Sequence, residues 1–265
     1  MGELRLPLHA ETRGRLYIVG SGPGGIEQMT GEAVWAIAAS DCVIGNQSYL
    51  DALQPLLAGK EVIRSSMGQE VERAKRSIAL AQNRTVAMIS GGDAGVYGMA
   101  SIVLEVLDHA EVKVPFVVIP GVTAANAAAA LLGSPLSGDF VTLSLSDLLT
   151  PLEVIEHRLS LAFQMGVPVA LYNPKSRGRP HNFAQAMEIA ARYRPAETPV
   201  GVVQNAYRDG ERVLVTTLGD VGTIEDQVDM HSIVILGGEE SRIFLRDDHG
   251  EGIITPRGYH RKYVY

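Results

Sequence analysis

The chain contains very little cysteine. Cys42 is the single one among 265 residues, which excludes an internal disulfide and a zinc site built from several thiolates. The seven histidines are scattered along the chain, and none forms the i, i+4 pair that holds zinc on a helix. We therefore expect neither a metal site nor metal-dependent catalysis.

Long hydrophobic runs and blocks of like charge are also missing. Glycine, proline or a charged residue interrupts each apolar stretch before it reaches the roughly 18 residues of a membrane helix. Residues 1–12 carry too many charges for a signal peptide, and the net charge of −7 is unfavourable for a general nucleic-acid-binding protein. A soluble cytoplasmic enzyme, without a membrane or nucleic-acid partner, is therefore the default prediction.

The residues that are present are typical of an ordered α/β protein. Hydrophobic residues make up 46% of the sequence and charged residues 20%. In the first half, short β-branched runs alternate with segments of helical periodicity, which favours a parallel sheet with helices on both faces. The expected strands are 16–19, 42–44, 61–63, 85–89 and 115–119, and the expected helices are 32–39, 48–57, 69–82, 96–107 and 124–132.

The segment GSPLSG, residues 133–138, is the best candidate for a linker because it places two glycines and a proline between periodic segments. It divides the chain into two predicted α/β domains, 1–136 and 137–265. Short connections between the last strands of the second domain favour a sheet that mixes parallel and antiparallel pairs. Its expected strands are 140–145, 168–172, 200–203, 212–217 and 232–236, and its expected helices are 151–165 and 182–193.

The first glycine-rich loop, GSGPGG at 20–25, has the G-x-G-x-x-G spacing of a dinucleotide-binding turn. In that fold the helix begins directly at the glycines, and an acidic residue closes the second strand to bind the ribose. Here the helix is expected to begin only after its N-cap, Thr30, while Asp41 precedes the second strand and Asn46 follows it. The pattern favours a strand-to-helix turn, although a nicotinamide-dependent oxidoreductase stays open on this loop alone.

Two further loops of small residues follow predicted strands. They read SGGDAGVYGMA at 90–100 and PGVTAANAAAALLG at 120–133. Ligands of open α/β sheets bind outside the carboxyl ends of the strands, and glycines let the backbone approach a ligand closely. Asp93 is either the N-cap of a helix that starts near Val96 or a hydrogen-bond acceptor for a ligand. Thr123 is the expected N-cap of the alanine-rich helix, whose small residues also suit tight packing on the sheet.

These loops, in combination with other segments, carry a resemblance. Eight segments occur in family order over about residues 15–259: the Gly-Pro-Gly turn at 22–24, GQEVERAKRSIALA, SGGDAGVYGMA, PGVTAANAAAALLGSPLSGDF, LSLSDLLTPLEVIEHRL, ALYNPKSRGRP, TPVGVVQNAYRDGE and ITPRGY. In this respect the chain resembles the tetrapyrrole (precorrin) methyltransferases, and among them the enzymes that methylate precorrin-3B at carbon 17 with ring contraction to precorrin-4 in cobalamin biosynthesis. The resemblance implies two α/β domains with the active site in the groove between them, and a homodimer.

The resemblance also implies which residues bind ligands. The cofactor would be S-adenosyl-L-methionine, leaving as S-adenosyl-L-homocysteine, and the substrate a small tetrapyrrole rich in carboxylates. The residues implied for the cofactor are Pro23, Gly91, Gly92, Asp93, Val96, Tyr97, Thr123, Ala124, Tyr172, Asn173, Asn205 and Ala206. Those implied for the substrate are Gly22, Gly24, Lys175, Arg177 and Arg179, with Arg13, Arg15 and Arg208 as weaker candidates. Arginine forks match carboxylates in bidentate geometry. A solvated basic loop is the alternative for residues 175–179.

Ring contraction requires proton transfer, and the sequence offers several acids or bases for it. The candidate catalytic residues are Asp93, Ser146, Asp147 and Tyr49, with Ser144 and His181 beside them. Asp147 also suits a cap of the turn before the next helix, and His181 suits a surface position.

The sequence departs from the family at the end of the second strand, where Gly45-Asn46-Gln-Ser-Tyr49 replaces a G-Y-x-x-Y pattern. The alternatives are an enzyme of the same family that acts at another position or on a cobalt-containing substrate, and a non-catalytic tetrapyrrole-binding module.

Overall fold

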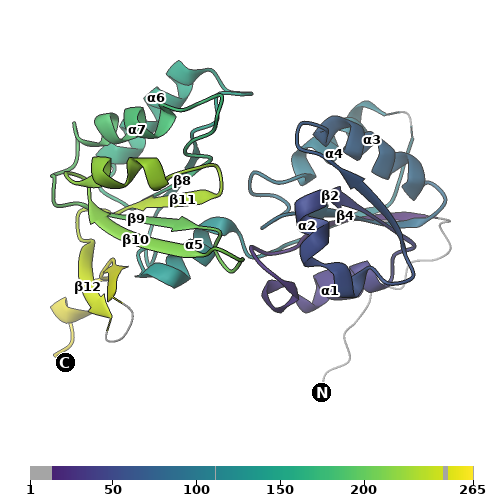
Figure 1. The fold of residues 1–265 in the computed structure, drawn as a ribbon, viewed down its shortest axis with the longest axis horizontal. Coiled ribbons are helices and arrows are strands. Elements are labelled where there is room, and N and C mark those ends of the chain that lie inside the picture. Colours follow the sequence, from purple (N-terminus) through teal and green to yellow (C-terminus); the bar gives the residue numbers. More distant parts are fainter. Residues whose placement is uncertain (1–13, 111, 247–249, 265) are drawn as a thin grey trace. The chain divides into compact units, whose positions relative to one another are not determined.

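The structure is a computed structural model, which describes residues 14–110, 112–246 and 250–264. The chain forms two compact units, Met1–Thr123 and Ala124–Tyr265 (Figure 1). Among the described residues, no helix is long and apolar enough to cross a membrane. The described residues also contain no group of three or more His, Cys, Asp or Glu side chains that could hold a metal ion.

The first unit is a five-stranded sheet in the order β3-β2-β4-β1-β5, with every neighbouring pair parallel. The strands are β1 (Arg15–Gly20), β2 (Cys42–Asn46), β3 (Glu61–Ser65), β4 (Thr85–Ser90) and β5 (Phe116–Ile119). The helices are α1 (Gly31–Ala38), α2 (Gln47–Ala52), α3 (Glu70–Ala81) and α4 (Ala100–His109), with 3-10 turns at Ile26–Gln28 and Gln54–Leu56. The predicted parallel sheet is confirmed.

Helices cover both faces of this sheet, which explains why most of its strands read as continuous apolar runs. One core joins the sheet to α3 and α4 through residues such as Ile78 and Val103. The other joins the opposite face to α1 and α2 through residues such as Ile37 and Leu50. Because every neighbouring pair is parallel, all five strands run in one direction, and their carboxyl ends lie along the same edge of the sheet.

The second unit has a mixed five-stranded sheet, in the order β10-β9-β11-β8-β7, as predicted. β7 and β8 are parallel, whereas β11 is antiparallel to β8 and β9, and β10 is antiparallel to β9. The strands are β7 (Val141–Ser144), β8 (Val169–Tyr172), β9 (Pro199–Gln204), β10 (Arg212–Thr217) and β11 (Ser232–Leu236). The helices are α5 (Ala124–Leu132), α6 (Leu152–Gln164) and α7 (Asn182–Ala190), with 3-10 turns at Val221–Gln227 and Tyr259–Arg261.

The second unit begins at Ala124, whereas the sequence boundary is drawn at residue 136. The reason is α5, which packs with the second sheet: Ala125, Ala128 and Leu132 share a core with residues of β8, β9 and β11. The Ala125 amide also donates to the Tyr172 hydroxyl at 2.9 Å.

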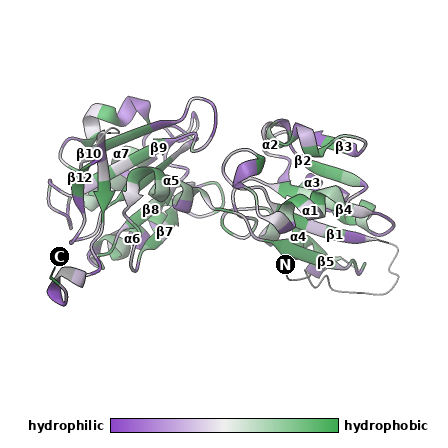
Figure 2. Cartoon of the chain, turned by 90° about the horizontal axis from the view of Figure 1, so that it is seen from below, coloured by the Kyte–Doolittle hydropathy of each residue, from purple (hydrophilic) through white to green (hydrophobic). Residues whose placement is uncertain are grey.

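A small third sheet, β12-β13-β6, lies within the expected linker and beyond the last predicted strand. It consists of β6 (Gly133–Ser134), β12 (Arg242–Arg246) and β13 (Gly250–Ile254). β6 pairs parallel with β13, with Gly133 opposite Ile253, so the first two residues of the expected linker belong to a strand. Both strands contain only short apolar stretches, IFL between two arginines in β12 and II after GEG in β13, which is a weak strand signal in the sequence. In both units the larger sheets are mostly hydrophobic while the helices carry both kinds of residue (Figure 2).

Candidate functional site

The loops that follow β1 and β4 are joined backbone to backbone. The Gly22 amide donates to the Gly92 carbonyl at 3.0 Å, and the Gly92 amide donates back to the Gly22 carbonyl at 2.8 Å. A Cβ on Gly121, in the loop after β5, would lie 2.3 Å from the Gly92 carbonyl oxygen. Gly22 and Gly92 have positive φ angles of 74° and 67°, which glycine adopts without steric cost. The backbones of three strand-end loops therefore lie in contact at Gly22, Gly92 and Gly121, where there is no room for a side chain.

Asp93 fixes two of these loops with its side chain. Its Oδ1 accepts from the amides of Gly95 at 2.7 Å and Val96 at 3.0 Å, and its Oδ2 accepts from the Gly121 amide at 2.9 Å. Asp93 therefore caps a tight turn, and the prediction that a helix starts near Val96 is wrong because α4 begins only at Ala100. The turn leaves Val96 and Tyr97 exposed, at 39% and 54%.

Tyr49, from α2, lies against the first glycine of the same loop. A Cβ on Gly91 would be 2.4 Å from the Tyr49 ring, which is half-buried. The absence of a side chain at Gly91 is therefore what lets the aromatic ring reach the carboxyl end of β4.

The geometry around the first loop argues against a dinucleotide clamp. The Thr30 side chain accepts from the Ala33 amide at 3.1 Å and caps α1, so the helix begins well after the glycines, and a 3-10 turn intervenes. Asp41 accepts from the Thr85 amide at the amino end of β4, while Asn46 ends β2 and caps α2 by accepting from the Ser48 amide. Gly22, Pro23 and Gly24 are themselves buried.

The second unit has its own polar edge, where β7, β8 and β9 end. The Asn173 side-chain amide donates to Ser144 Oγ at 2.9 Å, and the Ser146 backbone amide donates to the same oxygen at 3.2 Å. Tyr172 is buried and binds the start of α5 through its hydroxyl. Asn205 follows β9, and its amide donates to the His231 carbonyl at 3.1 Å.

Backbone strain coincides with the sequence-predicted site. Tyr97, Asn173, Asn205 and Tyr207 are the non-glycine residues with positive φ in the described parts of the chain, between 50° and 59°. The first three are among the residues implied for the cofactor. Left-handed conformations are costly for a tyrosine and are retained chiefly where function or surrounding structure requires them.

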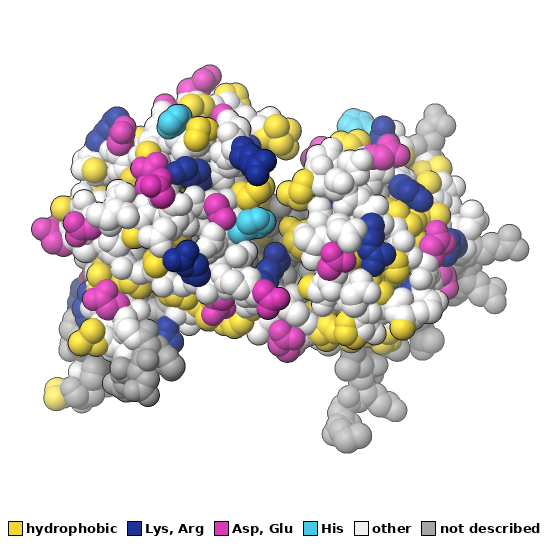
Figure 3. Space-filling model, in the orientation of Figure 1, with side chains coloured by type: hydrophobic (Ala, Val, Ile, Leu, Met, Phe, Trp, Pro, Cys, Tyr) yellow, Lys and Arg dark blue, Asp and Glu magenta, His cyan; other side chains and the backbone are white. Residues whose placement is uncertain are grey.

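The basic segment after β8 is partly neutralised by its own unit. Lys175 Nζ lies 3.4 Å from Glu225 Oε1, and Arg179 Nε lies 3.7 Å from Asp147 Oδ1. The Arg177 side chain is exposed. On the visible face of each unit, acidic and basic side chains are interspersed (Figure 3).

The remaining sequence-predicted residues are distributed as follows. Asp147 is ion-paired, His181 is an exposed residue before α7, and Arg208 is exposed. Arg15 lies at the amino end of β1, with its guanidinium 6.0 Å from the Tyr17 ring centroid, so it is not among the strand-end loops. Arg13 lies outside the described residues. Thr123 and Ala124 follow Gly121 at the start of α5.

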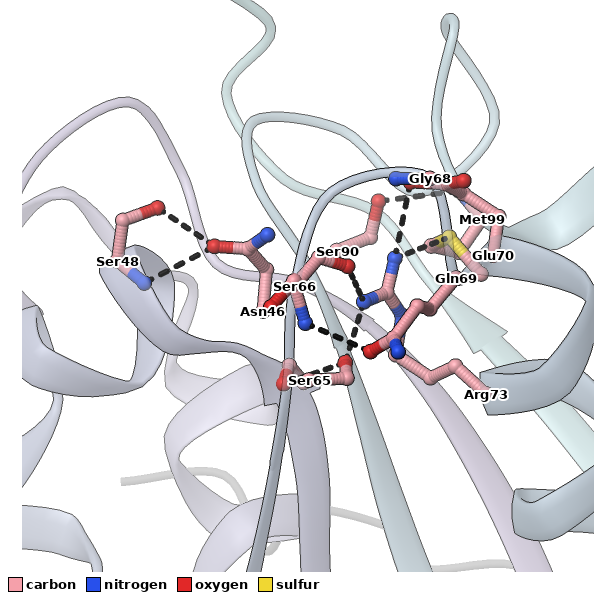
Figure 4. Close-up of polar contacts among 11 residues, drawn as sticks. Asn46, Ser48, Ser65, Ser66, Gly68, Gln69, Glu70, Arg73, Ser90 and Met99 are labelled. Atoms are coloured by element: carbon pink, nitrogen blue, oxygen red, sulfur yellow. Dashed lines mark hydrogen bonds and ion pairs between the residues drawn. The ribbon is translucent and has the colours of Figure 1, made fainter.

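Sequence reasoning missed a set of polar residues beneath these loops. Ser21 Oγ donates to the Ser90 carbonyl, and the Met99 amide donates to Ser90 Oγ at 3.1 Å. Arg73 of α3 reaches Ser65 and Met99 (Figure 4). The available signal was a charged residue on the apolar face of a helix, next to Ala74 and Ser77 in a segment of helical periodicity.

Comparison with known proteins identifies relatives over nearly the whole chain. Residues 15–222 match the family model "Tetrapyrrole (Corrin/Porphyrin) Methylases". The "Probable cobalt-factor III C(17)-methyltransferase" of Salmonella typhimurium is 44% identical over 92% of this chain and 99% of its own length. The "Precorrin-3B C(17)-methyltransferase" of Sinorhizobium sp is 42% identical over 93% of this chain and 97% of its own length.

Other relatives are longer. The "Cobalamin biosynthesis protein CbiHC" of Archaeoglobus fulgidus is 45% identical over 95% of this chain. The chain spans about half the length of this relative and of one from Priestia megaterium, 54% and 46%.

Solved structures agree on the fold. The methyltransferase CobJ superposes with a TM-score of 0.82 at 31% identity and covers 92% of this chain and 100% of its own. The uroporphyrin-III C-methyltransferase of Thermus thermophilus, solved in complex with S-adenosylhomocysteine, has a TM-score of 0.64 at 25% identity and covers 84% of this chain and 97% of its own.

Proposed function

The chain belongs to the tetrapyrrole (corrin/porphyrin) methylase family, and from this premise we propose that it transfers a methyl group from S-adenosylmethionine to ring carbon 17 of a precorrin-3B-type tetrapyrrole in cobalamin biosynthesis. The names of its relatives support this reaction. The structural observation that carries the proposal is the side-chain-free meeting point of Gly22, Gly92 and Gly121 beside an exposed loop tip.

The loops of the first unit fit such a cofactor. Backbone amides and carbonyls can approach a ligand closely where no Cβ intervenes, and Val96 and Tyr97 offer apolar and aromatic surface beside them. Gly91, Gly92 and Asp93 with Val96 and Tyr97 are the proposed contacts in this unit, and Thr123 with Pro23 belongs to the neighbouring loops. In the second unit, Ala124, Tyr172, Asn173, Asn205 and Ala206 are proposed as further contacts. The bound S-adenosylhomocysteine of the Thermus relative supports this cofactor.

Positioning is the main catalytic contribution we assign to the chain. S-adenosylmethionine supplies an activated methyl group on a sulfonium that is already a good leaving group, so no strong nucleophile or metal is required of the protein. What the residues must do is hold both reactants in attack geometry. We propose that the Asp93 carboxylate contributes to this positioning because it holds two loops in one conformation. We assign it this positioning role ahead of a role in proton transfer.

The tetrapyrrole substrate would be recognised by its carboxylates. Arg177 is the exposed cation of the basic segment, while Lys175 and Arg179 are oriented by Glu225 and Asp147. We propose that these three residues, with Gly22 and Gly24, face the substrate. For the proton transfer of ring contraction, Tyr49, Ser146 and Asp147 remain the proposed candidates.

The proposal leaves two substrates to compare, one that contains cobalt and one that is metal-free. Relatives carry names for both cobalt-factor III and precorrin-3B. The test is incubation of the purified protein with each substrate and isotope-labelled S-adenosylmethionine, followed by mass analysis of the pigment. Gain of one labelled methyl group with ring contraction supports the proposal, and the preferred substrate identifies the metal state. An unlabelled pigment from both incubations would contradict it.

A homodimer and a cytoplasmic location stay predictions that the resemblance alone supports. The nicotinamide-dependent alternative loses its basis because α1 starts at Gly31 and Asn46 ends β2.

A further inference from the structure

Arg73 is a buried cation at the carboxyl edge of the first sheet. It lies on α3, and its side chain is only 3% exposed. Its closest carboxylate oxygen, Glu70 Oε1, is 3.4 Å away on a side chain that is 40% exposed, and Arg73 Nε is buried without a hydrogen-bond partner. Burying a charge with incomplete pairing is costly, and a well-packed apolar residue is often at least as stable at such a position. Stability alone therefore does not explain an arginine here.

The contacts of Arg73 converge on the ends of neighbouring strands. Its Nη1 donates to Ser65 Oγ at 2.5 Å, at the end of β3, and Ser65 Oγ in turn donates to the Gly45 carbonyl of β2 at 3.1 Å. Its Nη2 donates to Met99 Sδ at 3.7 Å. Figure 4 shows the guanidinium of Arg73 among Ser65, Ser66, Ser90 and Met99.

Met99 is the last residue of the glycine-rich loop, and it is held from two sides. Its amide donates at 3.1 Å to the Oγ of Ser90, the last residue of β4, and Met99 is only 8% exposed. Ala94, in the middle of the loop, is fully buried and its carbonyl accepts from the Ala100 amide at 2.9 Å. Val96 and Tyr97 are exposed between these anchors, so their position depends on how Met99 is held.

We propose that Arg73 is a positioning residue for the loop Gly91–Met99, which ties the end of that loop to the ends of β3 and β2 and so fixes the backbone that meets the methyl donor. The inference rests on the proposed function, because the ligand of the loop is taken to be S-adenosylmethionine or its product. Arg73 touches no reacting group in this account and acts through Met99.

The experiment compares four proteins: wild type, Arg73→Met, Arg73→Lys and Arg194→Met. Arg194 is the matched control because it is also buried, at 5% exposure, with an unpartnered Nε, but it bonds the Val167 carbonyl before β8 in the other unit. Two quantities are measured on each: the affinity for S-adenosylhomocysteine by calorimetry, and hydrogen exchange of the loop amides 91–99 in the ligand-free protein.

We expect Arg73→Met to weaken S-adenosylhomocysteine binding about tenfold, the equivalent of one charge-assisted hydrogen bond, and to speed exchange of the loop amides. Arg73→Lys should recover part of the affinity and part of the exchange protection. Arg194→Met should leave the affinity and the exchange rates within about twofold of wild type. Equal affinity and exchange in Arg73→Met and wild type would overturn the proposal. Equal losses in Arg73→Met and Arg194→Met would overturn it as well, since they would reveal general destabilisation.

Ser90→Ala provides a second route if Arg73→Met fails to fold. This variant removes the hydrogen bond from the Met99 amide to Ser90 Oγ. It should weaken S-adenosylhomocysteine binding about threefold and speed hydrogen exchange of the loop amides. If neither quantity changed, the proposal that the contacts of Met99 position the loop would be refuted. If wild-type protein binds no S-adenosylhomocysteine, the proposed function fails, while the exchange data still decide whether Arg73 holds the loop.

Discussion

Gly22 and Gly92 exchange two backbone hydrogen bonds, of 3.0 and 2.8 Å, and so bind the loop after β1 to the loop after β4. The pair gives Gly22 of the G-x-G-x-x-G spacing a structural role within the chain itself. Gly22 has the positive φ angle that this pairing uses, and the loop continues through a 3-10 turn before a helix begins. A glycine pattern specifies close backbone approach, and the partner can be another loop of the same chain.

The first prediction concerns the crowding at Gly121. We expect Gly121→Ala to lower the free energy of unfolding by about 2 kcal/mol or more and to weaken S-adenosylhomocysteine binding, because the new Cβ would lie 2.3 Å from the Gly92 carbonyl oxygen. Gly31→Ala is the control, since a Cβ there meets nothing within 4 Å at the start of α1. Urea denaturation and calorimetry measure both effects, and equal stability of the two variants would show that the loops are not closely packed.

The second prediction separates two roles of Asp93. Asp93→Asn replaces an acceptor oxygen with an NH₂ group that would face a backbone amide of Gly95, Val96 or Gly121. We expect a loss of about 1–3 kcal/mol in stability together with weaker cofactor binding. Asp108→Asn, at an exposed position of α4, should change neither. Unaltered stability and binding with loss of product would instead identify Asp93 as a proton-transfer residue.

The third prediction concerns the substrate carboxylates. Arg177→Gln should raise the KM for the tetrapyrrole about tenfold, the equivalent of one charge-assisted pair, and leave the KM for S-adenosylmethionine nearly unchanged. Arg158→Gln, which removes another exposed arginine on α6, serves as the control. Steady-state kinetics with each reactant varied in turn give both constants. Parallel changes in the two KM values would remove the carboxylate-binding role of Arg177.

The fourth prediction follows from the buried thiol of Cys42. Burial raises the pKa of this thiol, and the nearby Glu61 carboxylate raises it further. Because the folded pKa lies above the unfolded one, the stabilisation is complete below the ordinary thiol pKa of about 8.5 and is lost as the pH rises through the folded value, by at most about 1.4 kcal/mol per pH unit. Wild type should therefore lose more stability than Cys42→Ala between pH 8 and 10.5 in urea denaturation. Parallel pH profiles of the two proteins would contradict this.

The elements that the sequence predicted correctly are those with a strong local pattern. The parallel strands β1, β2, β4 and β5 are built around apolar runs, and the helix Ala124–Leu132 is predicted at its observed bounds. Thr30 was expected as a cap and does accept the Ala33 amide. In each case the residues that decide the structure are neighbours in the chain.

The elements that were missed depend on distant residues. The start of α4 is displaced to Ala100 because Asp93 bonds Gly121 as well as the amides that follow it. Gly133 belongs to a strand only because Ile253 pairs with it. The role of Arg73 becomes visible only when Ser65 and Met99, from separate strand ends, lie beside it. These contacts join residues that are far apart in the sequence, so the spacing of residue types along the chain does not predict them.

The most direct test of the account is calorimetric titration of the purified protein with S-adenosylhomocysteine and, separately, with NADH. The account predicts saturable binding of one S-adenosylhomocysteine per chain, reduced in Gly121→Ala, and no heat of binding for NADH. Binding of NADH without binding of S-adenosylhomocysteine would contradict the claim that the glycine-rich strand ends hold a methyl donor.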